Sequence, residues 1–251
     1  METNKKMKIN KILRLKFSPD KDTYIASILG LLSIGFSLLM NYFTTDFGHW
    51  IFRVIFQISI VGIIFPIYLL SKKGKLKEAG LRFNKSFIHI LISIGIAGLL
   101  LFQFWTENNL LFSQFSKQSI EPASYIMVAN IYEVIFFVLF LRYSFEKAFG
   151  IIPAIILSAL FYSLHHAGFQ PEFVKLFIVG IVFISIFRIA NHWLICFPFW
   201  WVGGTVDVLT KAENISDLSG LDWTKSIFML IVIISTLTYF QYRENLKNIT
   251  L

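Results

Sequence analysis

The chain has 251 residues, of which 56% are hydrophobic, 17% aromatic and only 15% charged. A soluble domain carries about a quarter charged residues, so this composition excludes an ordinary globular enzyme and a disordered chain. The single cysteine, Cys196, excludes a disulfide scaffold. The net charge of +8 does not indicate nucleic-acid binding, because the basic residues lie at the ends of apolar runs. The sequence therefore predicts a polytopic membrane protein.

A helix needs about 20 apolar residues to cross the roughly 30 Å of hydrocarbon in a bilayer. Candidate runs lie, in chain order, at 24–43, 50–70, 87–105, 123–141, 151–168, 173–190, 193–210 and 227–241. The fifth to seventh runs are shorter or interrupted by Pro198, Gly203 and Gly204, which membrane helices tolerate when neighbouring helices satisfy the backbone. The predicted fold is all-α: a membrane helix bundle of about eight transmembrane helices.

The basic residues predict the orientation. Of the 23 Lys and Arg residues, 18 fall in segments on one side of the predicted membrane and four on the other. Because basic loops stay on the cytoplasmic side, both termini are expected there, as in a multi-pass protein of a prokaryotic cell membrane with the lipid bilayer as its surroundings. We expect a basic N-terminal segment at 1–23 without a cleavable signal peptide, one embedded domain at 24–241 and a tail at 242–251.

Ionisable residues inside a membrane are costly and mark candidate sites. Glu133 lies in the middle of the fourth span, with Asn130 one turn earlier, and His165 and His166 lie in the outer half of the fifth. The short turn predicted at 142–150 makes these spans antiparallel neighbours, with Glu133 facing His165. A Glu and one or two His form part of a zinc site, although a catalytic zinc needs three protein ligands, a water and a base.

The other polar residues have simpler interpretations. Arg53 can extend to the interface, His89 lies near an interface, and Asp207 in the seventh span can reach outer-leaflet water. Ser158 and His165 share a helix face, but bonding of the Ser158 hydroxyl to its own helix backbone is favoured over a catalytic dyad. The sequence contains no His-Glu-x-x-His, Gly-x-Gly-Asp or Gly-x-Ser-x-Gly motif.

The order of residues from Glu133 onward resembles the core of the CPBP family, the CAAX-protease and bacteriocin-processing type of intramembrane metalloprotease. The family's Phe-x-x-x-His motif is present as Phe161 to His165. Phe-Gly at 149–150 resembles the turn between the family's motif helices, and Lys-Glu-Ala-Gly-Leu-Arg at 77–82 resembles the segment that precedes them. The resemblance covers about 77–210 and implies a CAAX-protease-like core.

The same resemblance implies that most of the polar set is replaced. The family's second Glu falls at Val134 and its Arg at Val138, while the His and Asn of the third motif fall near Trp200 and Gly204. In the family, the paired glutamates and two histidines are thought to bind metal and activate water. Since Glu133, Phe161 and His165 alone remain, the resemblance supports the fold and argues against the activity.

Three functions follow as hypotheses. The leading one is a non-catalytic family member, a pseudoprotease without a cofactor, that binds a peptide, lipid or membrane-protein partner. The alternative is an active intramembrane metalloprotease acting on a peptide or prenylated substrate. In this alternative Glu133 and His165 would bind the zinc. The accessory residues would be His166, Asp207 and Asn130. The third is a cofactor-binding or transport subunit, for example one with haem between His89 and His165, which their different depths in the membrane disfavour.

Overall fold

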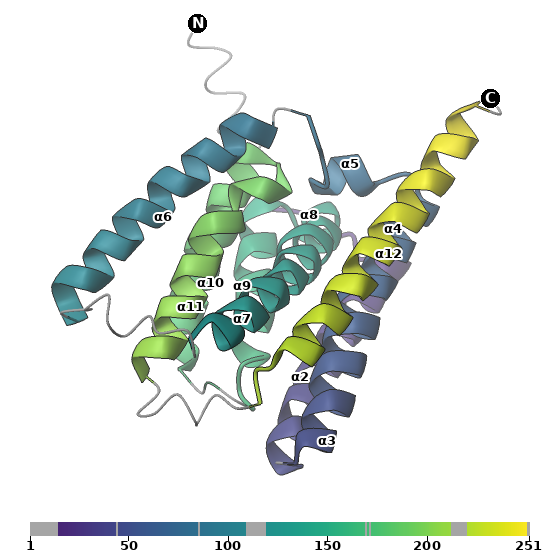
Figure 1. The fold of residues 1–251 in the computed structure, drawn as a ribbon. Coiled ribbons are helices and arrows are strands. Elements are labelled where there is room, and N and C mark those ends of the chain that lie inside the picture. The colour runs from purple at the N-terminus through teal and green to yellow at the C-terminus, as the bar shows by residue number, and fades with distance from the viewer. Residues whose placement is uncertain are drawn as a thin grey trace, which may run out of the picture.

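The computed structural model describes residues 15–43, 45–84, 86–108, 119–168, 170, 172–211 and 220–249. Every regular element in these ranges is a helix or a helical turn (Figure 1). The elements are α2 (Lys21–Tyr42), α3 (Asp46–Gly48), the π-helical segment η1 (His49–Ile64), α4 (Phe65–Lys72), α5 (Leu76–Ala79), α6 (Ser86–Asn108), α7 (Ile120–Glu133), the π-helical segment η4 (Val134–Leu141), α8 (Arg142–Phe149), α9 (Ile151–Leu164), α10 (Phe173–Ala190), the 3-10 turn η5 (Trp193–Ile195), α11 (Phe197–Lys211) and α12 (Trp223–Ile249).

Within the described ranges, six helices are long and apolar enough to cross a membrane. They occupy Lys21–Tyr42, Asp46–Lys72, Ser86–Thr106, Ile120–Phe149, Phe173–Ala190 and Trp223–Arg243. Helices also lie at the other two predicted positions, but α9 has 14 residues and α11 has 15. The predicted all-helical, membrane-protein character is therefore confirmed, and six of the eight predicted spans are long apolar helices.

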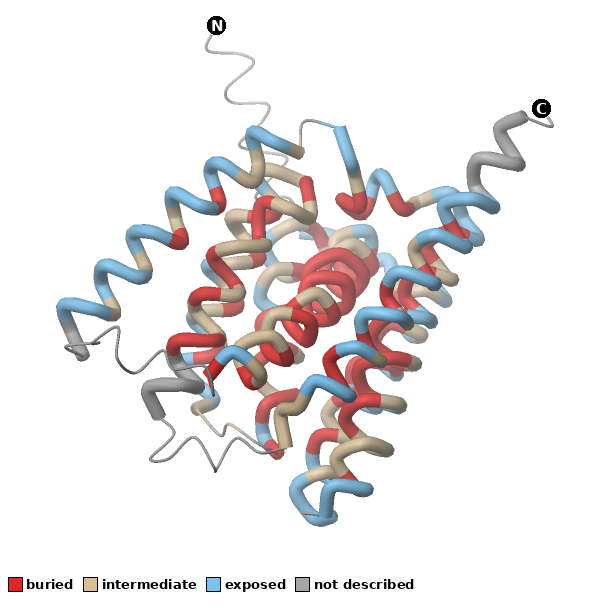
Figure 2. The backbone as a smooth tube through the Cα atoms, in the orientation of Figure 1, coloured by how far each residue is buried: buried red, intermediate tan, exposed pale blue. Residues whose placement is uncertain are grey.

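The span formed by α7, η4 and α8 is the centre of the bundle. In the most apolar stretch of this span 83% of the residues are buried, compared with 11% in the corresponding stretch of α6. Figure 2 shows the contrast: the central helix is almost continuously buried, and α6 at the edge is mostly exposed. All eight residues of η4 are buried, and its sequence, Val-Ile-Phe-Phe-Val-Leu-Phe-Leu, contains no polar side chain. Polar residues beside η4, such as Glu133, are thus enclosed by protein.

The predicted turn at 142–150 is wrong, because helix α8 continues to Phe149. The chain reverses at Gly150, whose φ of 96° is a conformation that favours glycine. The polar stretch stays helical because Arg142 is satisfied inside the bundle. Its guanidinium donates to the carbonyl oxygens of Val138 and Ala79 and pairs with Glu146 at 2.7 Å.

Three other predicted boundaries also change. The fifth span ends at Leu164 rather than 168, so His165 and His166 lie in the turn that follows it. The seventh begins at Phe197, after a 3-10 turn that occupies the first part of the predicted range. Helix α12 continues to Ile249, so the predicted tail is helical over 242–249.

Packing brings the end of α9 and the start of α11 towards the central span. Helix α9 packs against α8 and α10, and α11 packs against α6 and α7. Small residues allow the close approach: a Cβ added at Gly180 would lie 3.1 Å from the Cβ of Ala159, and one added at Gly204 would lie 3.1 Å from Nδ2 of Asn130. The polar residues of α7, the turn after α9 and α11 consequently meet.

A buried lysine joins α3 to the start of α12. The side chain of Lys225 is 1% exposed and pairs with Asp46 at 2.6 Å and with Asp222. Partial burial opposes ionisation of Asp222, but hydrogen bonds from Lys225 and Thr224 outweigh it and lower the pKa of that carboxyl group to about 2. The ionised form of Asp222 therefore stabilises this end of the bundle.

Candidate metal site

Three buried side chains converge at the centre of the bundle. Glu133 is the last residue of α7, and His165 and His166 follow α9. Nε2 of His165 lies 3.4 Å from Oε1 of Glu133, and Nε2 of His166 lies 3.7 Å from the same oxygen. One ligand atom from each residue lies within 4.8 Å of the other two, and no other group of three His, Cys, Asp or Glu in the described ranges meets this criterion. Each residue is at most 5% exposed.

Both imidazole rings are oriented by one backbone carbonyl. Nδ1 of His165 and Nδ1 of His166 both face the carbonyl oxygen of Tyr162, the latter at 2.8 Å. The carbonyl is in the last turn of α9, where helix carbonyls lack an intrahelical partner. Since a carbonyl oxygen only accepts, Nδ1 of each ring donates to it, and the Nε2 atoms of both rings face Glu133. Histidines that bind metals are commonly oriented by this kind of hydrogen bond.

The arrangement fits a divalent metal ion better than a shared proton. A protonated imidazole beside a carboxylate normally closes to about 2.7–2.9 Å, and both Nε2 atoms lie farther than this from Glu133. Ligands about 2.0–2.2 Å from a tetrahedral zinc lie roughly 3.3 Å apart, which is close to both distances. Glu133, His165 and His166 therefore provide donor atoms that zinc accepts, and the distances from Glu133 to the two histidines suit a shared ion.

The other oxygen of Glu133 is held by α11. Nε1 of Trp200 donates to Oε2 of Glu133 at 2.9 Å, and the carbonyl oxygen of Trp200 accepts from Nδ2 of Asn130 at 3.2 Å. The indole is 2% exposed, with ring contacts to Phe183 at 4.8 Å and Tyr162 at 5.5 Å. Trp200 thus lies directly against the cluster and fixes the direction of the carboxylate.

Of the remaining expected site residues, His166 joins the cluster and Phe161 lies outside it. His166, expected as accessory, is a full member of the cluster. The side chain of Asp207 lies outside the described part of the chain. Phe161 packs against Phe145, with ring centroids 5.8 Å apart, and against Gly30, so it is a packing residue. The histidine of this Phe-x-x-x-His motif, His165, does lie next to Glu133, as expected from the antiparallel pairing of the two spans.

Two interpretations of the polar residues change. Arg53 does not extend to the interface: it is 5% exposed and donates to Oε1 of Gln57 at 2.8 Å. Its guanidinium lies 5.8 Å from the ring centre of Tyr132, the residue before Glu133. The hydroxyl of Ser158 is buried and makes no hydrogen bond with the described residues, so the expected bond to its own helix is absent.

His89 is not a partner for His165. Its ring stacks on that of His192, with centroids 4.1 Å apart and planes 8° apart, while Nε2 of His192 faces the carbonyl oxygen of Asn84 at 2.8 Å. His165 is instead surrounded by the rings of Tyr132 and Phe137. These contacts give no support to haem held between His89 and His165.

Comparison of the chain with models of protein families, with curated proteins and with solved structures finds no match. Similarity to known proteins therefore assigns neither a family nor an activity to this chain. What bears on function is the local chemistry of the cluster formed by Glu133, His165 and His166.

Proposed function

We propose that the protein is a CPBP-like membrane protein that holds a zinc ion between Glu133, His165 and His166 and has no peptidase activity. In this proposal the scaffold binds a peptide, lipid or membrane-protein partner. The observation that carries it is the convergence of one carboxylate oxygen and two imidazole nitrogens, with both rings fixed by the carbonyl of Tyr162. The approach of Trp200 to Glu133 agrees with the CPBP-like order of motifs, because Trp200 stands where the family has its distal histidine.

The topology belongs to the same proposal. Helices α9 and α11 complete a set of eight transmembrane segments, with both termini in the cytoplasm of a prokaryotic cell. Both short helices pack against other helices: α9 contacts α8 and α10, and α11 contacts α6 and α7. Polar backbone at membrane depth is tolerated in such positions because protein, rather than lipid, surrounds it.

The absence of peptidase activity follows from the groups around Glu133. A bound zinc would supply a Lewis acid, but peptide hydrolysis also needs a base to take a proton from water. The resemblance puts Val134 where the family has its second glutamate, and Val134 is fully buried. In the described ranges no second carboxylate belongs to the cluster, and the indole of Trp200 occupies the remaining oxygen of Glu133.

A second candidate is an active intramembrane metallopeptidase with an altered ligand set. The observation in its favour is His166, which raises the protein ligands to three, the number typical of catalytic zinc sites. The two candidates share the metal site and differ only in turnover, so one set of variants separates them.

The experiment measures zinc and peptide cleavage on the same purified protein. We expect about one zinc per chain in wild type, as in catalytic and structural sites, and loss of zinc in Glu133→Gln and His166→Asn. His89→Gln is the matched control, since it changes a histidine outside the cluster, and should keep its zinc. No cleavage of peptides in the membrane is expected. Zinc-dependent cleavage that Glu133→Gln abolishes would establish the second candidate, and a wild type that binds no zinc would refute both.

A further inference from the structure

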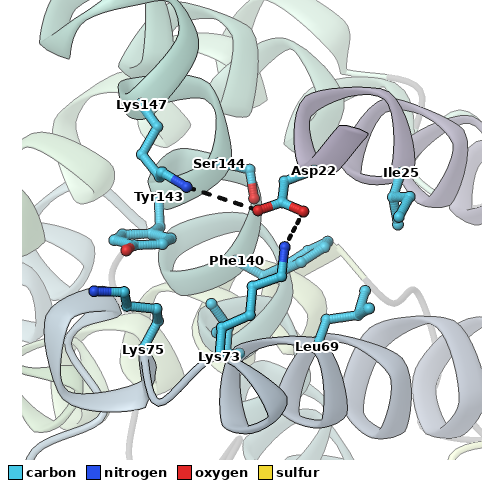
Figure 3. A pocket seen from close by; sticks show the side chains of 10 residues that line it. Asp22, Ile25, Leu69, Lys73, Lys75, Phe140, Tyr143, Ser144 and Lys147 are labelled. Atoms are coloured by element: carbon cyan, nitrogen blue, oxygen red, sulfur yellow. Dashed lines mark hydrogen bonds and ion pairs between the residues drawn. The ribbon is translucent and has the colours of Figure 1, made fainter. Parts of the chain in front are cut away.

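A small, partly open hollow lies between the start of α2, the end of α4 and α8 (Figure 3), and none of the candidate metal ligands lines it. One part of its wall is apolar and includes Ile25, Leu69 and Phe140. The other part is polar and includes Lys73 and Lys147, whose ammonium groups both point towards the space around Asp22 in Figure 3. The hollow therefore combines an apolar wall with a charged rim, on which Lys73 and Lys147 share the carboxylate of Asp22.

Of the cations at the rim, Lys147 has only distant carboxylate partners, whereas Lys73 and Lys75 have close ones. Nζ of Lys147 lies 3.7 Å from Asp22 and 3.8 Å from Asp20, and both distances exceed a hydrogen bond. Lys73 is hydrogen-bonded to Asp22, and Lys75 pairs with Glu78 at 2.6 Å. The three lysine side chains are 39–45% exposed, and ion pairs with this exposure contribute little to stability. Because these ion pairs are exposed, a phosphate can compete with Asp22 for Lys73 and Lys147, against the repulsion of that carboxylate.

The position of the hollow identifies the ligand class. It opens among segments that carry the basic excess of the chain, and the inference rests on the proposed topology, which places these segments at the anionic inner leaflet. Tyr24 and Ile28, which flank Ile25 on α2, are 61% and 57% exposed and provide an apolar surface beside it. A second, smaller hollow between α4 and α12 also joins basic and aromatic residues, including Lys72 and Arg243. Basic pockets between membrane helices on this side suit lipid phosphates.

We propose that this hollow binds an anionic phospholipid, with the headgroup phosphate between Lys73 and Lys147 and acyl carbon against Ile25, Leu69 and Phe140. A free phosphate would satisfy the lysines but leave the apolar wall uncovered, so the lipid has the larger contact. Asp22 competes with the phosphate for both lysines. The lipid site is independent of the proposed zinc site.

The test uses the full-length protein in neutral detergent and measures lipid binding by native mass spectrometry. Dioleoylphosphatidylglycerol is compared with dioleoylphosphatidylcholine, which has the same chains and no net charge, and with inorganic phosphate. We expect Lys73→Gln and Lys147→Gln each to weaken binding of the anionic lipid about fivefold, as for a cation close to a lipid phosphate. Asp22→Asn should strengthen binding, because it removes the competing carboxylate.

Lys175→Gln is the matched control. Lys175 is 47% exposed, pairs with Glu172 and does not line the hollow, so its replacement should leave lipid binding unchanged. Thermal unfolding without added lipid identifies any variant with altered folding. Lys147→Gln is the variant least expected to change folding, because Lys147 makes no close hydrogen bond to Asp22. Equal binding of both lipids would overturn the proposal. So would a Lys147→Gln effect no larger than that of Lys175→Gln, or inorganic phosphate that competes as strongly as the lipid.

Discussion

Replacement of Trp200 by phenylalanine removes the hydrogen bond from α11 to Glu133 while keeping an aromatic ring in its place. The bond joins Nε1 of Trp200 to Oε2 of Glu133 at 2.9 Å, and at 2% exposure no solvent replaces it. A buried hydrogen bond contributes about 1 kcal/mol. The space left by the smaller ring, about 40 Å³, costs about another 1 kcal/mol. We expect the free energy of unfolding to fall by about 2 kcal/mol.

The adjacent tryptophan is the control. Nε1 of Trp201 donates to the carbonyl oxygen of Ala123 at 3.2 Å, and this side chain is only half-buried. Trp201→Phe loses a neutral hydrogen bond, so it should cost about 1 kcal/mol. Equilibrium unfolding in mixed micelles with a chelator present measures both variants without metal. If Trp200→Phe costs no more than Trp201→Phe, the indole does not support Glu133 as argued.

The same substitution in a Glu133→Gln background tests the hydrogen bond itself. The glutamine amide oxygen still accepts from the indole, so Trp200→Phe should cost about as much there as in wild type. Because Trp200 orients a proposed zinc ligand, Trp200→Phe should also weaken zinc binding about 10–100-fold, as is typical when a residue that hydrogen-bonds to a metal ligand is lost. A much smaller cost in the Glu133→Gln background would contradict this prediction.

Three other measurements test the remaining structure. Glu146→Gln should lower the free energy of unfolding by about 2 kcal/mol, measured by the same unfolding assay, because it leaves the buried guanidinium of Arg142 without its carboxylate; no loss would contradict that role. Asp222 has a depressed pKa of about 2 when folded, so its stabilisation is present above pH 4 and is lost as the pH falls towards 2. Asp222→Asn should remove that part of the acid dependence of thermal unfolding, and an unchanged profile would contradict it. Lys77→Cys in a Cys196→Ser background should react with impermeant reagent only from the cytoplasmic side of cells; labelling from outside would reverse the proposed topology.

The membrane architecture was largely predictable because it depends on summed apolar length. Runs of apolar residues set the helices, and the order of spans brought Glu133 close to His165 at 3.4 Å. Helix ends were less predictable, since they depend on tertiary partners. The stretch that begins at Arg142 is polar and suggests a loop, yet it is helical because carbonyl oxygens of other turns accept from Arg142.

The site was only partly predictable. No sequence motif marks His166 as a ligand. It joins the cluster because α9 ends at Leu164 and the following turn places both histidines against one carbonyl oxygen. Trp200 has the composition of a core residue, and its contact with Glu133 depends on how α11 packs on α7. The burial of Arg53 had a sequence signal in Gln57, one turn later, which supplies its acceptor.

X-ray absorption at the zinc edge tests the central claim most directly. The purified protein, reconstituted with one equivalent of zinc, should show only nitrogen and oxygen ligands at about 2.0–2.2 Å, together with the outer-shell scattering of two imidazole rings. His166→Asn should remove one imidazole contribution, and Glu133→Gln should lower occupancy. A sulfur ligand at about 2.3 Å, which only Cys196 or a methionine could supply, or a spectrum without imidazole scattering, would contradict a zinc site formed by Glu133, His165 and His166.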